Sequence, residues 1–109
     1  MQIDFSLLRL DDATIKDIQI SADAICIEYL DWQERTINLV FKNAISCYLF
    51  SPHGKPLLRG TVESSGDYLN ECCRLAEEDD FSRFRVFNFV DAWNDNQIVR
   101  IVAEWVEEI

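Results

Sequence analysis

The sequence predicts a β-rich α+β fold: about six antiparallel strands, arranged as a curled sheet or a small sandwich, with one α-helix packed on them. Short segments in which apolar residues alternate with polar ones recur along the chain, and only the region around residue 70 has the apolar spacing of a helix. The chain has 109 residues, of which 49% are apolar, enough for a core without metal or disulfide bonds. We therefore expect residues 1–109 to form a single domain.

Four segments in the first half of the chain predict a meander of strands joined by short turns. In the first segment the isoleucines are spaced three and then two residues apart, which breaks strict alternation and predicts a bulge. The second alternates without a break and is expected to form a hairpin with the first. The third places its isoleucine, leucine and phenylalanine on one face, which predicts the core side. The four segments are Thr14–Ile20, Ala24–Leu30, Thr36–Lys42 and Ile45–Phe50.

The second half of the chain predicts one helix and two further strands. Ser64 and Asp67 resemble a capping box, and the apolar residues that follow have helical spacing. The acidic run Glu77–Asp80 is unfavourable at the negative end of a helix dipole, so we expect the helix to fray there. Phe84–Val90 has apolar residues in both phases, which predicts a central strand covered on both faces. Gln97–Glu108 fits a helix or a strand, and its β-branched residues favour a strand.

The charge of the chain is strongly negative and unevenly distributed. Its net charge is −10. Eight acids and two bases give residues 1–34 a charge of −6, four bases without an acid give residues 35–62 a charge of +4, and twelve acids and four bases give residues 63–109 a charge of −8. This balance opposes binding to nucleic acid or anionic membranes and favours a basic protein partner, although solubility alone would also explain it.

The residues that build most catalytic and metal sites are scarce. His53, the only histidine, lies in a loop next to proline and glycine, where no ordered triad is expected. The four cysteines lack the spacing of a zinc site, and the three glycines are too far apart for a phosphate-binding loop. We therefore expect no cofactor, no metal and no catalytic residues. A small hydrolase that uses two carboxylates is the remaining enzymatic alternative.

The location of the protein is also predicted from composition. The first residues lack the basic segment and apolar run of a secretory signal, and no apolar run approaches the roughly 20 residues that cross a bilayer. Free cysteines are typical of a reducing compartment. We expect a cytoplasmic protein.

Three acidic turns, two of which hold a tryptophan, are the candidate partner-binding sites. A tryptophan can fill a pocket on a partner or accept a cation on its ring face. The structural alternative is that each tryptophan folds over the end of the sheet. The candidates are Asp31, Trp32 and Glu34 in one turn, Glu77, Glu78, Asp79 and Asp80 in a second, and Asp91, Trp93 and Asp95 in a third.

Three short motifs resemble those of small, uncharacterised bacterial β-rich proteins, some of which are immunity proteins of toxin systems. The motifs are Leu10-Asp11-Asp12-Ala13 followed by three isoleucines, Phe41-x-Asn43-Ala44, and Asp91-Ala92-Trp93-Asn94. The resemblance implies no catalytic residues, and this chain has Asp12 where such proteins often have histidine. The leading prediction is a non-catalytic protein that neutralises a basic, toxin-like partner. The alternative is a constitutive subunit or a self-associating structural protein, such as a homodimer.

Overall fold

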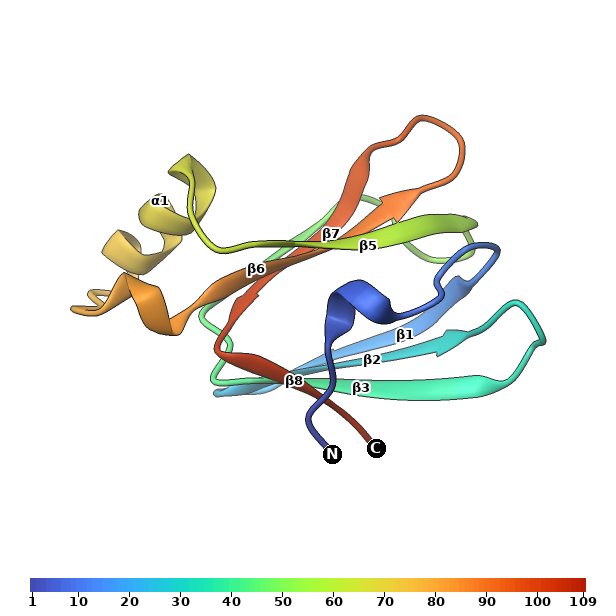
Figure 1. Cartoon of the computed structure of the whole chain (residues 1–109), viewed down its shortest axis with the longest axis horizontal. Coiled ribbons are helices and arrows are strands. Elements are labelled where there is room, and N and C mark those ends of the chain that lie inside the picture. Colours follow the sequence, from blue (N-terminus) through green and yellow to red (C-terminus); the bar gives the residue numbers. More distant parts are fainter.

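A computed structural model describes all 109 residues and contains two four-stranded antiparallel sheets packed against each other, with one α-helix at one end (Figure 1). The predicted β-rich α+β class is confirmed, but the chain forms eight strands instead of about six. The first sheet contains, in spatial order, β1 (Thr14–Ile20), β2 (Ala24–Leu30), β3 (Thr36–Lys42) and β8 (Trp105–Glu108). The second contains β4 (Ser46–Leu49), β7 (Gln97–Ala103), β6 (Arg85–Asp91) and β5 (Leu57–Glu63).

The predicted hairpin and its bulge are confirmed, whereas the predicted four-stranded meander is wrong. β1, β2 and β3 pair in sequence, and the register of β1 shifts between Ile15 and Asp17. The chain then turns at Asn43, whose φ of +54° lies in the left-handed region that asparagine tolerates. β4 consequently leaves the first sheet and pairs with β7 in the second.

The two additional strands have different origins. Leu57–Glu63 lacks regular alternation and contains Gly60, so no strand was predicted there, yet it pairs with β6 along its length. The segment Gln97–Glu108 is extended, as predicted, but it breaks at Glu104. There the backbone N–H of Glu104 donates to the carbonyl of Lys42, and the chain passes from β7 in one sheet to β8 in the other.

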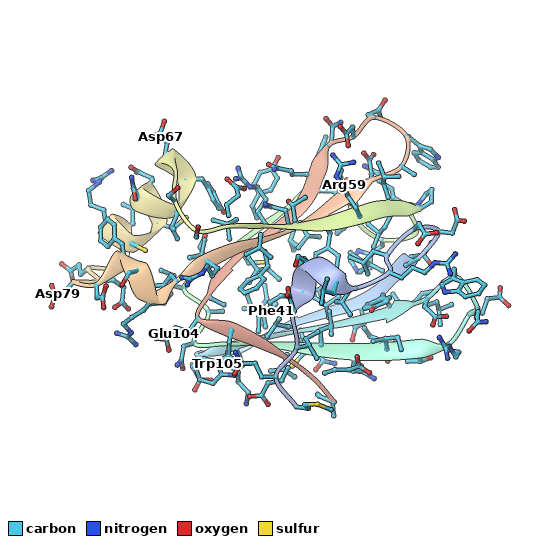
Figure 2. All side chains as sticks on the ribbon, in the orientation of Figure 1. Phe41, Arg59, Asp67, Asp79, Glu104 and Trp105 are labelled. Carbon is cyan, nitrogen blue, oxygen red and sulfur yellow. The ribbon has the colours of Figure 1, made fainter.

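The main core lies between the sheets and is closed by the N-terminal segment. Phe5, in the short 3-10 helix η1 (Phe5–Leu7), packs edge-to-face against Phe41, Phe87 and Phe89, with ring centres 5.1 to 5.9 Å apart. Figure 2 shows Phe41 directed into the space between the sheets. Every residue of β6 after its first is buried, which confirms the prediction of a covered central strand.

The helix α1 (Asp67–Leu75) covers part of the outer face of the second sheet. Its apolar side packs Leu69, Cys72 and Cys73 against β6 and β7 in a second, smaller core. The helix begins at Asp67, after Gly66, and ends before the acidic run, as the dipole argument predicts. A second 3-10 helix, η2 (Phe81–Arg83), leads into β6. Neither α1 nor any other helix of the structure is long and apolar enough to span a membrane.

Candidate functional site

The turn between β2 and β3 is held together by the buried side chain of Asp31. One carboxylate oxygen accepts hydrogen bonds from the backbone N–H groups of Gln33 (2.9 Å) and Arg35 (2.8 Å), and the other accepts the guanidinium of Arg35 at 2.9 Å. Burial alone would raise the pKa of Asp31, but these hydrogen bonds outweigh it and hold the pKa below the usual 3.8. This carboxylate therefore stabilises its own turn and is not free for a partner.

Trp32 follows Asp31 and has one face of its ring covered. The guanidinium carbon of Arg9 lies 4.0 Å from the ring centre, and Arg9 also forms a 3.0 Å ion pair with Asp11. The ring borders a depression of about 400 Å³, which includes Tyr29, where burial and then two nearby carboxylates raise the pKa to about 12. Trp32 remains 42% exposed, so a partner can reach part of its ring.

The turn between β6 and β7 is also held together by a buried aspartate side chain. Asp91 is buried, and one of its carboxylate oxygens accepts two backbone N–H groups of the turn, the closer being that of Asn96 at 2.8 Å. Trp93 projects from this turn and is 66% exposed, so it does not fold over the sheet. Asp95 pairs with Arg59 of β5 at 2.8 Å. This turn presents a tryptophan to solvent while two of its carboxylates are already engaged.

The acidic run after α1 is also partly engaged within the chain. Asp80 caps η2 by accepting the backbone N–H two residues on (3.1 Å), and the hydrogen bonds from that serine lower its pKa. Glu78 lies 3.8 Å from the guanidinium of Arg83. Glu77, whose φ is +59°, and Asp79 are exposed and form no ion pair. The free negative charge of this run therefore comes mainly from Glu77 and Asp79.

The three candidate turns do not form one surface. The turns that begin at Asp31 and Asp91 lie at one end of the 41 Å long axis, and the acidic run after α1 lies at the other end (Figure 1). We call the first the hairpin end and the second the helix end. The sequence could not predict this separation, because it depends on the direction in which each strand crosses its sheet. Glu34, exposed and without an ion pair, is a free carboxylate at the hairpin end.

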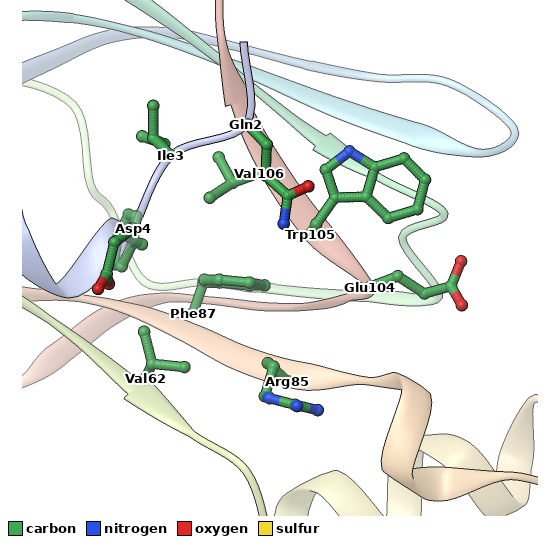
Figure 3. Close-up of a pocket in the computed structure, with 10 residues that line it drawn as sticks. Gln2, Ile3, Asp4, Val62, Arg85, Phe87, Glu104, Trp105 and Val106 are labelled. Carbon is green, nitrogen blue, oxygen red and sulfur yellow. The ribbon is translucent and has the colours of Figure 1, made fainter.

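A cleft of about 330 Å³ opens between the sheets beside the N-terminal segment (Figure 3). Its floor includes the buried side chains of Phe87 and Val106, and Arg85 and Glu104 lie at its rim. Hydrogen bonds from Arg83 (2.6 Å) and from an asparagine amide lower the pKa of Glu104, and in Figure 3 its carboxylate points away from the cleft. A carboxylate held ionised in this way is unsuited to act as a general acid. No sequence motif marked this cleft, because its lining comes from four separate segments.

A second depression, of about 520 Å³, lies on the outer face of the second sheet between α1 and β4. Tyr48, Phe50 and Tyr68 form aromatic walls around it, and the guanidinium of Arg100 lies 4.0 Å from the ring centre of Tyr68. Arg100 donates to Glu63 at 2.9 Å, so its charge is already balanced. No sequence motif marks this depression, and the alternation of Tyr48 and Phe50 on one strand face is the only signal for it.

The structure holds no group of three or more histidine, cysteine, aspartate or glutamate side chains that could bind a metal ion, and all four cysteines are free. Four carboxyl groups have clearly displaced pKa values, and all four pKa values are lowered. In each group, burial raises the pKa, but hydrogen bonds together with a nearby positive charge lower it by more. The four groups are Asp31, Asp80, Glu104 and Glu107. A hydrolase that uses two carboxylates needs one with a raised pKa, so none of these four fits the acid role.

Comparison with known proteins adds no family assignment. No protein-family model matches the chain, and neither curated protein sequences nor solved structures gave a significant match.

Proposed function

We propose that this chain is a non-catalytic binding protein that occludes a basic protein partner, and that the hairpin end makes the contact. One observation carries the proposal: Trp93 and Trp32 stand on two separate turns at the same end of the molecule, and their side chains are 66% and 42% exposed. Tryptophan is the residue most enriched among those that dominate binding energy, because its ring buries a large area with few rotatable bonds. Its ring face also attracts cations.

The two turns are suited to binding because they are already ordered. The carboxylates of Asp31 and Asp91 each fix two backbone N–H groups of their turn. A partner therefore need not supply the free energy of ordering these loops, which is one of the costs of association. The carboxylates that the sequence analysis assigned to the partner thus support binding indirectly.

The negative charge of the helix end supports the first encounter with a basic partner and not the tight contact that follows. Residues 67–80 contain six acids and one base, a net charge of −5. At physiological salt a charge is screened within about 8 Å, so this end cannot bind a partner that sits at the hairpin end of a 41 Å molecule. It can still attract a basic protein during encounter at low salt. We assign attraction to the whole acidic surface and tight contact to the two tryptophans.

An immunity protein that covers the working surface of a basic toxin is the particular case we favour, because the chain resembles such proteins in its short motifs and carries a net charge of −10. Occlusion requires only a rigid surface of complementary charge, and needs no reaction at the binding site.

The test is capture of the partner by the tagged protein from a lysate of cells that make it, at low and at high salt, followed by binding kinetics with the basic protein recovered. Replacing Trp32 and Trp93 together by alanine should weaken binding by about thirtyfold or more, mainly through faster dissociation. The matched control is Leu75→Ala, which removes an exposed apolar side chain from the helix end. Equal binding by the double variant and the wild type would refute the hairpin end as the contact.

A further inference from the structure

The outer edge of β4 differs from the other three sheet edges. The edge of β8 is joined by the N-terminal segment, where the N–H of Ile3 donates to the carbonyl of Val106 at 3.1 Å. The edge of β5 lies beside η1, and the backbone N–H of Asp12 donates to the carbonyl of Leu57 at this edge. The edge of β1 carries a bulge and the charged pair Lys16-Asp17. Residues 45–50, which contain β4, have no charge, no proline and no glycine.

This lack of protection is unusual, because an open strand edge is a template for pairing with another chain. Proteins that remain monomeric usually protect their edges with charges, proline, bulges or covering segments. Three edges of this protein have such protection, whereas β4 is protected only by its short length of four residues. In addition, the three large apolar residues in and next to β4 are exposed: Tyr48 by 45%, Leu49 by 41% and Phe50 by 52%.

Two residues of β4, Cys47 and Leu49, have backbone N–H and C=O groups that point away from β7. The N–H of Phe50 donates to the carbonyl of Ile98 in β7 at 2.9 Å. Since antiparallel strands alternate, Ser46 and Tyr48 also direct their backbone groups to β7, and Cys47 and Leu49 direct theirs away from it. None of the hydrogen bonds outside the helices and strands uses the backbone of Cys47 or Leu49.

We propose that β4 pairs antiparallel with β4 of a second copy of this chain, on a twofold axis at Tyr48. In that register Cys47 lies opposite Leu49 of the partner subunit, and the reverse pair is formed by symmetry. Each pair exchanges two hydrogen bonds, so the four bonds use every free backbone group of the strand. The second sheet of each copy then joins that of the other, which gives one continuous sheet of eight strands.

The neighbouring registers leave groups unpaired. An axis at Cys47 would place Leu49 opposite Ile45 of the partner subunit, and the N–H of Ile45 is already bonded to Val102 at 2.9 Å. An axis at Leu49 would require Cys47 to pair with Ser51, whose φ of +42° does not continue the strand. Only the axis at Tyr48 uses both free residues.

The side chains support this register. Two residues that face each other without exchanging hydrogen bonds have Cα atoms about 4.5 Å apart, so the two Tyr48 rings would meet on the outer face of the joined sheet. Phe50 would flank them on each side. The depression beside Tyr48 and Tyr68 gives the rings room to pack. The exposed apolar surface of the edge would thus become buried.

The charge distribution favours a second copy over the basic partner of the proposed function. β4 belongs to the segment 35–62, which holds four bases and no acid. Arg100 lies opposite Tyr48 in β7, and Lys55 lies 4.9 Å from the ring of Phe50. Residues 45–50 offer no carboxylate to a basic protein. Two copies with a net charge of −10 each approach with least repulsion through their least acidic region.

The experiment measures the molar mass of the full chain in solution over a range of concentrations, together with amide hydrogen exchange. We expect a mass of twice 12.7 kDa for the wild type. Tyr48→Lys brings two like charges together at the axis and should raise the dissociation constant of the dimer by roughly tenfold or more. The matched control is Ile20→Lys, which adds the same charge at an exposed apolar residue on the edge of β1 and should leave the dimer unchanged.

Hydrogen exchange in the wild type tests the register without any variant. The amides of Cys47 and Leu49 should become protected as concentration rises, whereas those of Tyr48 and Phe50 are protected at every concentration. A mass of 12.7 kDa at the highest concentration reached would overturn the proposal. So would a dimer in which the Cys47 and Leu49 amides still exchange rapidly. Since the hairpin end is not involved, loss of binding by the tryptophan variants has no effect on this result.

Discussion

Asp31 and Asp91 perform the same task in two different hairpins: each accepts two backbone N–H groups of its turn with one carboxylate oxygen, at 2.8 to 3.3 Å. In both turns a tryptophan follows within two residues. Both turns also contain an acidic residue in the left-handed region, Glu34 at φ +62° and Asp95 at φ +57°. The protein thus presents two tryptophans by one repeated local design, although the turns belong to different sheets.

The first prediction concerns the pH dependence of stability. The pKa of Asp31 in the folded protein is lower than its usual 3.8, because the hydrogen bonds from Arg35 and Gln33 outweigh burial. A lowered folded pKa contributes stability that is present above the unfolded pKa and is lost as pH falls through the folded one. The free energy of unfolding should therefore fall as the pH drops below 3.8, and Asp31→Asn should weaken that fall.

Denaturant unfolding at several pH values tests this prediction. Asp31→Asn should be less stable than the wild type at neutral pH, and the two curves should converge in acid. Glu34→Gln is the matched control, because Glu34 lies in the same turn and forms no ion pair. If the free energy of unfolding of the wild type and of Asp31→Asn changed with pH in parallel, the charge of this carboxylate would not contribute to stability.

The second prediction concerns the contact between β5 and the N-terminal segment. A Cβ atom on Gly60 would lie 2.6 Å from Cε2 of Phe5 and 3.0 Å from Leu10. Since Phe5 and Leu10 are both fully buried, neither can move aside easily. Gly60→Ala should reduce the free energy of unfolding by about 1–3 kcal/mol, the usual cost of overfilling a core.

A double-mutant cycle checks this cause. Phe5→Leu shortens the side chain that the new methyl group would meet, so adding it to Gly60→Ala should cost less than the two changes summed. Chemical unfolding of the four proteins gives the coupling. A strictly additive result would mean that Gly60 is required for some other reason than its contact with Phe5.

Strands with regular alternation of apolar and polar residues could be predicted from the sequence. β2 and β3 alternate without interruption, and both were predicted with correct bounds. β5 was missed because its central residue is Gly60, which is required by Phe5 from a distant part of the chain. β4 was recognised as extended, but nothing local indicates that Asn43 turns it into the other sheet. Pairing between strands is a property of the whole topology.

The candidate site was predicted less well, for a related reason. The turns were located correctly, but Asp31 and Asp91 were expected to face a partner and are instead buried in their turns. Composition shows that a turn is acidic; it does not show which carboxylate the backbone will use. The depression lined by Tyr48, Tyr68 and Arg100 could not be predicted, because these residues lie on three separate elements.

The third prediction concerns the polar network on the outer face of the second sheet. Asn88 is fully buried, and its amide nitrogen donates to Thr61 (3.1 Å) and Glu63 (2.7 Å) while its oxygen accepts the guanidinium of Arg100 at 3.0 Å. Asn88→Ala removes all three bonds, so the Thr61 hydroxyl and the Arg100 Nε lose their partner, while Arg100 and Glu63 keep their own ion pair. We expect a loss of about 1–3 kcal/mol in the free energy of unfolding.

Thermal or chemical unfolding of Asn88→Ala and Thr61→Val provides the comparison. Thr61→Val removes one of the three hydrogen bonds and keeps a β-branched side chain on the strand, so it should cost roughly 1 kcal/mol. If Asn88→Ala proves no less stable than Thr61→Val, water replaces the lost partners and the network contributes little.

The last prediction concerns the four free thiols, which differ in accessibility. Cys73 lies on the inner face of α1 and is fully buried, and burial, followed by the neighbouring Cys72 and Glu78, raises the pKa of its thiol. Cys26 lies part-exposed in a small depression on the outer face of the first sheet. Since the thiolate is the reactive form and must be reached by the reagent, Cys26 should be modified first and Cys73 last.

Timed alkylation followed by peptide mass spectrometry measures each thiol separately. In the folded protein the modification of Cys73 should wait for local opening of α1, and its rate should rise to that of Cys26 in denaturant. Cys26→Ser should abolish the fastest phase and leave the slowest unchanged. Equal rates for Cys26 and Cys73 without denaturant would mean that α1 opens readily and that the smaller core does not hold it against the sheet.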